Sequence, residues 1–188
     1  MISFIVLVVL VVALIAWVVG MYNRLVALRN RYQNAFSQID VQLKRRYDLI
    51  PNVVETVKGY AAHEKGTLEA VITARNKAMG AQGPAAKAEA ENILTGALRQ
   101  LFALAEAYPQ LRAVESFTQL QKTLGEIEEA IQNARRYYKA VVRDLNTKIA
   151  QFPSNIIAGM FGFNAREFFE LKDAAQREAP KVSFGAGA

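Results

Sequence analysis

Few side chains in this sequence could support catalysis or bind a metal. The chain has no cysteine, and His63 is its one histidine. His63 and Glu64 begin the zinc-protease pattern H-E-x-x-H, but Thr67 stands where the second histidine would be. One histidine also cannot supply the two Glu-x-x-His pairs that a carboxylate-bridged metal site in a bundle needs. We therefore expect no metal or other cofactor, and we expect His63 to lie on the surface of a helix.

Patterns typical of nucleotide binding and of serine hydrolases do not occur in this sequence. It contains no G-x-x-x-x-G-K-[ST], no G-x-G-x-x-G and no G-x-S-x-G. The adjacent carboxylates Glu128 and Glu129 fall on the polar side of a periodic helix, among lysines and arginines, as solubilising charges do. The sequence therefore predicts that the protein is not an enzyme.

The most informative segment is the opening MISFIVLVVLVVALIAWVVG, which carries no charged side chain. About 20 apolar residues are needed to cross the hydrocarbon core of a bilayer, so residues 2–22 are expected to form one transmembrane helix. A buried core helix and a secretory signal peptide are the alternatives. A signal peptide needs a basic leading region and a small-residue cleavage site, and neither is present here. We therefore predict that residues 1–22 form a retained membrane anchor.

Basic residues follow this segment directly. Arg24, Arg29 and Arg31 come after the apolar stretch, while no lysine or arginine precedes it. The positive-inside rule then places the N-terminus outside and the body in the cytoplasm, and the three arginines are expected to contact lipid headgroups. A periplasmic body is the alternative, because the lack of cysteine fits either compartment.

The net charge of +6 does not indicate a nucleic-acid partner, because it is concentrated in one short region. Six basic residues and one acidic residue between Arg24 and Arg46 give +5, and the remainder of the body is almost neutral. Lys44, Arg45 and Arg46 lie too far along a straight helix to reach headgroups. They are expected to form a solvated helix face or to pair with Asp48 inside the bundle.

The body is predicted to be all-α, with a helical bundle domain at residues 23–172. A first helix should continue out of the bilayer until Pro51 interrupts or kinks it, and a second should run from there to residues 80–83, with Gly59 and Gly66 inside it. Pro84 suits the first turn of a third helix. A long fourth helix is indicated by apolar residues at a 3-4 spacing, and these are Phe117, Leu120, Leu124, Ile127, Ile131, Ala134, Tyr138, Val141 and Leu145.

Short connections between these long helices favour an antiparallel, four-helix-like bundle. The third helix is expected to bury Ile93, Leu94, Leu98, Leu101 and Ala105.

The end of the chain is rich in phenylalanine. Five of the ten phenylalanines fall between residues 152 and 169. Asn164 and Glu167 have the spacing of a capping box, which predicts a short helix that begins at Asn164. The segment should either fold over its own bundle or contact lipid or another protomer. The residues of this apolar contact are Phe152, Ile156, Ile157, Phe161, Phe163, Phe168 and Phe169. Residues 173–188 are expected to form a disordered tail.

Three strings in the sequence resemble the LemA family of bacterial membrane proteins. They contain LKRRYDLIPN, ARRYY and FPSNIIA, and the resemblance covers the anchor and almost all of the body. It implies a protein that is anchored in the bacterial cell membrane, with a short N-terminus outside and a helix-rich, four-helix-like body in the cytosol. The biochemical role of the family is poorly defined, with suggested ties to envelope homeostasis, membrane organisation and the neighbourhood of membrane proteases. Gly66 and the tail after Phe184 depart from what the resemblance leads us to expect.

The residues of these strings suggest a polar cluster, because arginine forks and tyrosine hydroxyls suit bidentate hydrogen bonds. We expect it either at the membrane-distal end of the bundle or at a contact between subunits. Its members are Lys44, Arg45, Arg46, Asp48, Asn52, Arg135, Arg136, Tyr137 and Asn155.

The sequence thus predicts a non-enzymatic membrane scaffold that self-associates. Its expected partners are the lipid bilayer, further copies of the chain and, as an additional candidate, another membrane protein, and nucleic acid is not expected. The alternative is an adaptor or regulator of a membrane enzyme such as a metalloprotease, which would use the same helix faces.

Overall fold

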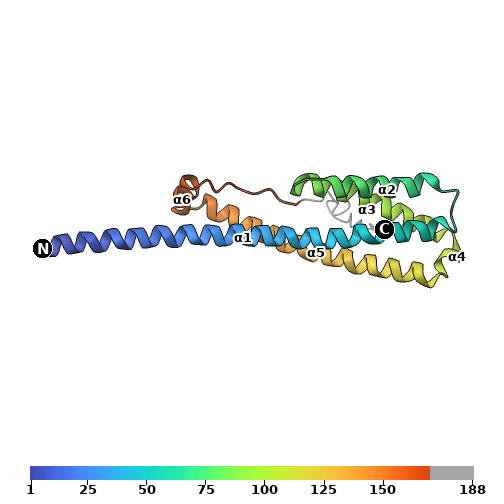
Figure 1. Ribbon diagram of the computed structural model, residues 1–188, viewed down its shortest axis with the longest axis horizontal. Helices are drawn as coiled ribbons and strands as arrows, with labels where there is room; N and C mark the ends of the chain where they lie inside the picture. Colours follow the sequence, from blue (N-terminus) through green and yellow to red (C-terminus); the bar gives the residue numbers. More distant parts are fainter. Residues whose placement is uncertain (170–188) are drawn as a thin grey trace, which may run out of the picture.

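A computed structural model describes residues 1–169 of the chain, and these residues form helices joined by turns (Figure 1). The described part contains no strand, which confirms the all-α prediction. The helices are α1 (Ile2–Lys58), α2 (Lys65–Gly80), α3 (Pro84–Glu106), α4 (Pro109–Arg112), α5 (Glu115–Ala150) and α6 (Ser154–Met160). The tail predicted at residues 173–188 lies outside the described residues.

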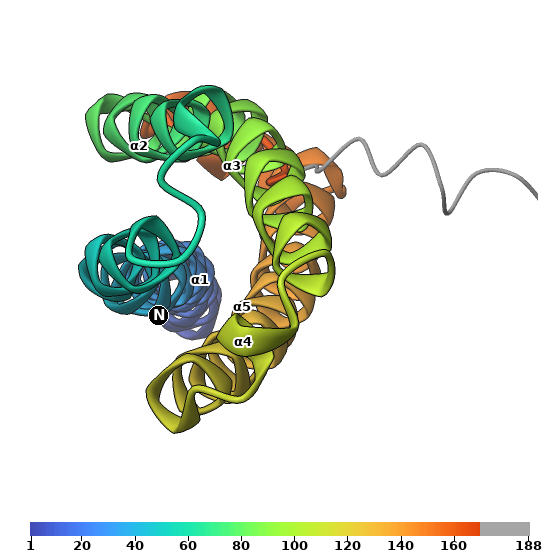
Figure 2. The same cartoon turned by 90° about the vertical axis from the view of Figure 1, so that its right-hand side faces the viewer.

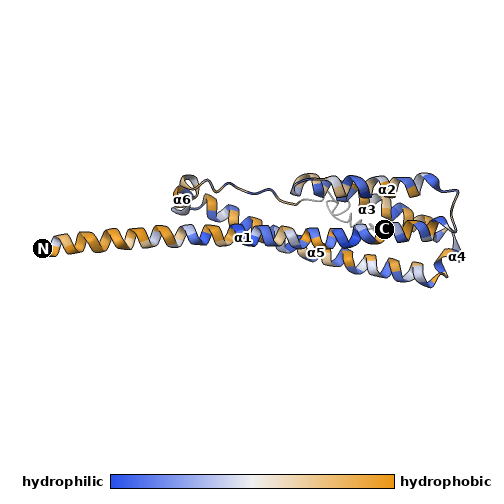
Figure 3. Cartoon of the chain, viewed as in Figure 1, coloured by the Kyte–Doolittle hydropathy of each residue, from blue (hydrophilic) through white to orange (hydrophobic). Residues whose placement is uncertain are grey.

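Helix α1 is 57 residues long and gives the molecule its elongated shape. Its N-terminal part projects beyond the other helices and is apolar along its length (Figures 1 and 3). Buried positions begin at Leu25 and recur at Ala35, Ile39 and Leu43, where α1 enters the bundle. One helix therefore joins the exposed apolar segment to the packed core.

Pro51 does not interrupt α1, which continues to Lys58, so the expectation of a separate second helix from Pro51 onward is wrong. A proline inside a helix has no N–H for the carbonyl four residues earlier, which here is the carbonyl of Tyr47. The structure supplies a replacement donor, because Nε of Arg75 on α2 donates to the oxygen of Tyr47 at 2.7 Å. The chain instead turns at residues 59–64, so α2 begins at Lys65 and Gly59 lies outside it.

This arrangement predicts a coupling between Arg75 and Pro51. Replacing Arg75 with alanine should lower the free energy of unfolding by about 1.5–3 kcal/mol, because the charged donor to a partly buried carbonyl is lost. In a Pro51→Ala background the restored N–H can serve that carbonyl, and the Arg75→Ala change should cost clearly less. Denaturant unfolding of the four proteins of this cycle measures the coupling. Equal costs in the two backgrounds would contradict the explanation.

The long helices run antiparallel and surround a shared core. Viewed from the bundle end, α2, α3 and α5 form an arc, with α1 on its inner side (Figure 2). The stripe predicted on the long helix is confirmed, because seven of its nine residues are buried on α5 and Leu120 and Ala134 are partly buried. The predicted four-helix-like bundle is thus present, and only α1 and α5 continue beyond α2 and α3 toward the apolar end (Figure 1).

Helix α3 begins at Pro84 as predicted, and it buries Leu94, Leu98, Leu101 and Ala105. Ile93 is an exception, because it is exposed. His63 is exposed as expected, but it lies in the turn before α2 and not on a helix.

The short C-terminal helix lies earlier in the chain than the sequence predicts. It is α6, at Ser154–Met160, and residues 164–169 are not helical. The side chain of Asn146 on α5 accepts the N–H of Arg166 at 2.7 Å and donates to its carbonyl at 2.9 Å. Tyr138 donates its hydroxyl to the carbonyl of Glu167 at 2.8 Å. These contacts with α5 satisfy backbone groups that a helix would otherwise pair internally.

A glycine-dependent turn sends the chain back along the bundle after α6. Gly162 has a φ of 69°, and the N–H of Phe163 donates to the carbonyl of Ala158 at 2.9 Å. This is the Schellman ending of a helix, in which a residue in the left-handed region reverses the chain. Phe163 thereby packs with Leu25 and Ile157 in a small second core.

Candidate functional site

The exposed part of α1 is the most distinctive surface of the molecule. It is the one helix among the described residues that is long and apolar enough to cross a membrane, and the most apolar window of the helix is not buried at all. In the bundle, by contrast, most of the apolar residues of α1 are buried against other helices. This exposed surface needs an apolar environment outside the chain.

Basic side chains lie on α1 directly after this segment, and Lys148 of α5 lies beside them. Arg24 and Arg31 line a cavity of about 320 Å³ with Ala27, Leu28 and Lys148, and no acidic residue is among the lining residues. The third predicted headgroup residue, Arg29, places its guanidinium 5.4 Å from the centre of the Phe163 ring. Arg29 therefore also joins the second core, where it makes a cation–π contact.

Aromatic rings gather at the same level. Tyr22 lies 4.8 Å from Phe161 and 5.8 Å from Phe163, measured between ring centres. Tyr22 lies at the end of the apolar segment. Aromatic side chains are commonly found at this position in helices that cross a membrane.

A buried ion-pair group joins three helices in the bundle. Nη1 of Arg46 on α1 lies 3.0 Å from Oε2 of Glu91 on α3 and 3.3 Å from Oε2 of Glu128 on α5. Nη2 of Arg46 donates to the hydroxyl of Thr95 at 3.1 Å, and the Tyr47 hydroxyl donates to Glu91. The side chains of Arg46 and Glu91 are 7% and 2% exposed, so this charge pair is shielded from water. We call these five residues the Arg46 group.

Burial governs the titration of this group. It raises the pKa of Glu91 above its ordinary value, although the hydrogen bond from Tyr47 and the charge of Arg46 act in the opposite direction. Burial and the bond to Glu91 also raise the pKa of Tyr47. The tyrosine therefore stays a neutral donor. The group has a satisfied set of partners, which is typical of a structural ion pair.

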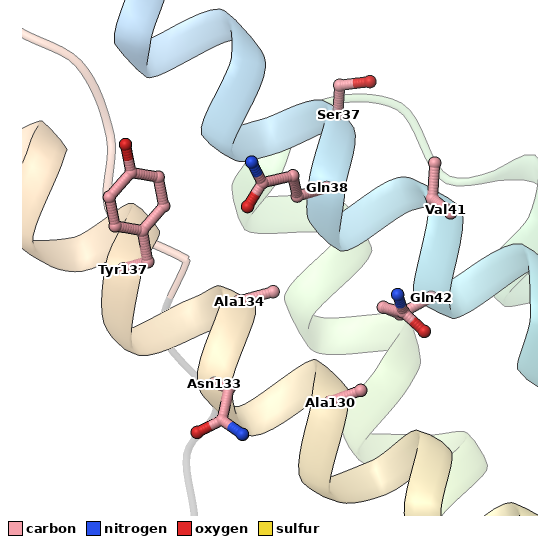
Figure 4. A pocket seen from close by; sticks show the side chains of 8 residues that line it. All are labelled: Ser37, Gln38, Val41, Gln42, Ala130, Asn133, Ala134 and Tyr137. Atoms are coloured by element: carbon pink, nitrogen blue, oxygen red, sulfur yellow. The ribbon is translucent and has the colours of Figure 1, made fainter.

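A groove of about 550 Å³ runs between α1 and α5 on the outer surface. Its side chains come from both helices and none is charged (Figure 4). They are Ser37, Gln38, Val41 and Gln42 on α1 and Ala130, Asn133, Ala134 and Tyr137 on α5. Val41 and Tyr137 are exposed, which leaves an apolar element on each side of this uncharged groove.

The structure does not bring the predicted polar residues into one cluster within the chain. Arg46 is buried in the group described above, whereas Lys44, Arg45, Asp48 and Asn52 are exposed on α1. Its partners are thus Glu91 and Glu128 instead of Asp48, so Glu128 is more than a solubilising charge.

The remaining predicted polar residues lie toward the other end of the bundle. Arg136 bonds to Asn133, Tyr137 lines the groove, and Asn155 is exposed on α6. Arg135 lies with its guanidinium 5.4 Å from the centre of the Phe169 ring. A role for these residues in contacts between subunits stays a prediction.

The predicted apolar contact divides into an inner and an outer set. Ile157, Phe163 and Phe169 are buried and Phe168 is partly buried, so these residues fold onto their own bundle. Phe152, Ile156 and Phe161 are exposed.

Sequence reasoning missed Glu91, Tyr47 and Thr95. Glu91 sits among small residues in AEAENIL, and a buried carboxylate there has no local signature. Glu91 and Thr95 are four residues apart, so both lie on one face of α3. This spacing was the one sign in the sequence that the two side chains could share a partner. Among residues 1–169, no three histidine or carboxylate residues lie close enough together to hold a metal ion.

Comparison with known proteins places the chain among relatives. The model of the LemA family matches residues 35–184. Magnetosome protein MamQ 2 of Paramagnetospirillum magneticum is 27% identical over 190 residues, which cover 87% of this chain and 70% of the relative. Magnetosome protein MamQ of Magnetospirillum gryphiswaldense is 24% identical over 189 residues, with the same coverage. Protein LemA of Metamycoplasma hominis is 28% identical over 144 residues, covering 74% of this chain and 64% of the relative.

Proposed function

Because this chain belongs to the LemA family, we propose that it is a non-enzymatic scaffold of the bacterial cell membrane, anchored by residues 2–22. The observation that carries the proposal is the apolar, unburied start of a helix that continues without a break into the bundle core. The names of its relatives refer to a structure, the magnetosome, or to the family itself, and none refers to a reaction.

Arg24 and Arg31 support a place for the body at the inner surface of the membrane. Both arginines follow the span within about 14 Å along a straight helix, where anionic headgroups attract basic side chains. Because Arg24, Arg29 and Arg31 follow the span, the positive-inside rule favours an outward N-terminus and a cytoplasmic body.

Self-association of the scaffold through the groove between α1 and α5 is part of this proposal. Anchors hold all copies at one height, so the groove of one copy faces the same level of the next copy. Because no charged residue lines the groove, two copies can meet there without removing water from a charged group. The exposed side chains of Val41 and Tyr137 provide apolar contact area. A second copy is therefore the occupant that fits.

Substitution in the groove tests self-association. Val41→Glu should weaken it at least tenfold, because two copies would bring like charges together in a surface that excludes water. Ile72→Glu is the matched control, because Ile72 is an exposed apolar residue on α2, outside the groove. Sedimentation of the gently solubilised full chain at micromolar concentration measures the effect. A monomeric native protein, or equal behaviour of the two variants, would refute the proposal.

The rival function is an adaptor or regulator of a membrane enzyme. Affinity capture of the native chain from solubilised membranes distinguishes the two functions. Capture of copies of the chain alone supports the scaffold, whereas one stoichiometric enzyme, such as a metalloprotease, would favour the adaptor.

A further inference from the structure

We infer that α6 and the residues around it form a second membrane contact, in which an apolar turn enters the headgroup region beside the anchor. The inference rests on the proposed anchor and adds a lipid-binding surface that is distant from it in the sequence. Four exposed side chains make up this surface, and we call them the α6 wedge. They are Phe152, Ile156, Met160 and Phe161.

The position of α6 supports this inference. Ile157 and Ala158, on the inner face of α6, pack against Leu25, and Val18 and Tyr22 border the same small core. Residues 18–22 of α1 are the end of the apolar segment and Leu25 follows three residues later, so α6 lies at the level where that segment ends (Figure 1). If α1 spans the bilayer, the packing of this core places the wedge at the bilayer surface.

The composition of the segment fits that environment. No charged residue occurs from Phe152 to Phe163. Phe152 is 79% exposed and Met160 is 72% exposed, more than any other large apolar side chain between residues 21 and 169. Beyond residue 20, no ten-residue stretch outside this segment of the described part holds more than two exposed large apolar residues, whereas these four fall within ten residues. An exposed apolar patch of this kind marks a contact surface.

Basic side chains near the wedge favour a lipid surface as its partner. The basic cavity of Arg24, Arg31 and Lys148 lies between α1 and the end of α5, the helix that leads into α6. Amphipathic elements that lie in a membrane interface combine an apolar face with nearby lysine or arginine, and they enter the boundary between headgroups and acyl chains. The wedge and the cavity supply these two features at one level of the molecule, so an anionic phospholipid surface is the partner that fits both.

Depth-dependent fluorescence quenching in the full chain tests the inference. Trp17 is the one tryptophan of the sequence and lies in the span, so the native chain reports on the anchor. A Trp17→Phe, Met160→Trp variant is the wedge reporter. A Trp17→Phe, Tyr60→Trp variant is the control reporter, because Tyr60 is exposed just beyond the far end of α1. Each protein is placed in vesicles of phosphatidylcholine and phosphatidylglycerol that contain lipids brominated near the headgroup or near the chain end.

The wedge reporter should be quenched at least twofold more strongly by lipids brominated near the headgroup than by lipids brominated near the chain end. The control reporter should be quenched by neither lipid and should remain open to aqueous iodide. If lipid quenches Trp17 in the native chain but leaves the wedge reporter unquenched, the inference that the wedge contacts lipid is overturned, whereas the proposed anchor is supported. Protection of the wedge reporter from both lipid and iodide shows a protein contact and also overturns the inference. Loss of lipid quenching for Trp17 as well refutes the anchor itself.

Discussion

Replacing Arg46 with methionine should lower the free energy of unfolding by about 3–5 kcal/mol, because it leaves the carboxylate of Glu91 buried without its cation. Arg46 is the centre of a group that joins α1, α3 and α5, and its guanidinium contacts Glu91 at 3.0 Å and Glu128 at 3.3 Å. Denaturant unfolding of the full chain in detergent measures this loss, provided that helicity at the start is unchanged.

Two further variants make this prediction specific. Arg45→Met removes the adjacent charge, which is exposed and bonds only to Gln42 among the described residues, and it should cost no more than about 0.5 kcal/mol. The double variant Arg46→Met, Glu91→Leu removes both buried charges and should recover most of the stability, since apolar pairs replace buried ion pairs at little cost. A double variant as unstable as Arg46→Met would contradict the interpretation of this group.

The loss caused by Arg46→Met should also depend on pH. Without the nearby cation, the pKa of Glu91 in the folded state should rise further above its already raised value. A raised folded pKa means that the folded state binds the proton more tightly, so the variant gains stability as the pH falls through that pKa. The deficit relative to the native chain should therefore be larger at pH 8 than at pH 5. A stability deficit of the variant that grows as the pH falls would contradict this prediction.

Tyr138→Ala should lower the free energy of unfolding by about 3–5 kcal/mol, as expected for removal of a fully buried aromatic side chain. Tyr138 is completely shielded from solvent. Its ring centre lies 5.6 Å from that of Tyr32 and 5.9 Å from that of Phe36. Its hydroxyl also holds the carbonyl of Glu167, so the substitution should loosen the returning segment as well.

The neighbouring tyrosine provides the control for this prediction. Tyr137→Ala changes an exposed side chain that lines the groove, and it should alter stability by less than about 1 kcal/mol. Tyr138→Phe should cost about 1 kcal/mol, because it keeps the ring contacts and loses the hydrogen bond. Limited proteolysis near Arg166 should become faster in Tyr138→Ala than in Tyr137→Ala. Equal stability losses for the two alanine variants would show that the core is placed wrongly.

Regular periodicity made most of the fold predictable from the sequence. The 3-4 spacing from Phe117 to Leu145 marks the buried face of α5, because a helix of this length needs one continuous stripe to pack against its neighbours. The start of α3 at Pro84 followed from local chemistry, since proline suits the first turn of a helix. The uncharged opening segment was equally clear from composition.

Features that depend on a partner distant in the sequence were not predictable. Pro51 indicates a helix break locally, and only the fold shows that Arg75 serves the carbonyl it leaves unpaired. Asn164 and Glu167 indicate a helix start, but contacts with Asn146 and Tyr138 hold that segment in another conformation. In each case, a side chain that tertiary packing brings near overrides the local signal.

The candidate site shows the same division. The basic residues after the apolar segment were identified from their order in the chain, whereas Glu91 was not, because its importance comes from its burial beside Arg46. The apolar C-terminal residues were recognised as a group, but the division into inner and outer members required the reversal at Gly162.

Labelling of single cysteines tests most directly whether α1 spans the membrane and holds the bundle at its surface. The native chain has no cysteine, so Ile2→Cys and Tyr60→Cys each introduce one reporter thiol, the first at the start of α1 and the second just beyond its end. In spheroplasts with an intact cell membrane, a membrane-impermeant maleimide should label the Ile2→Cys variant at once and the Tyr60→Cys variant only after permeabilisation. Labelling of both variants from the same side would contradict the account.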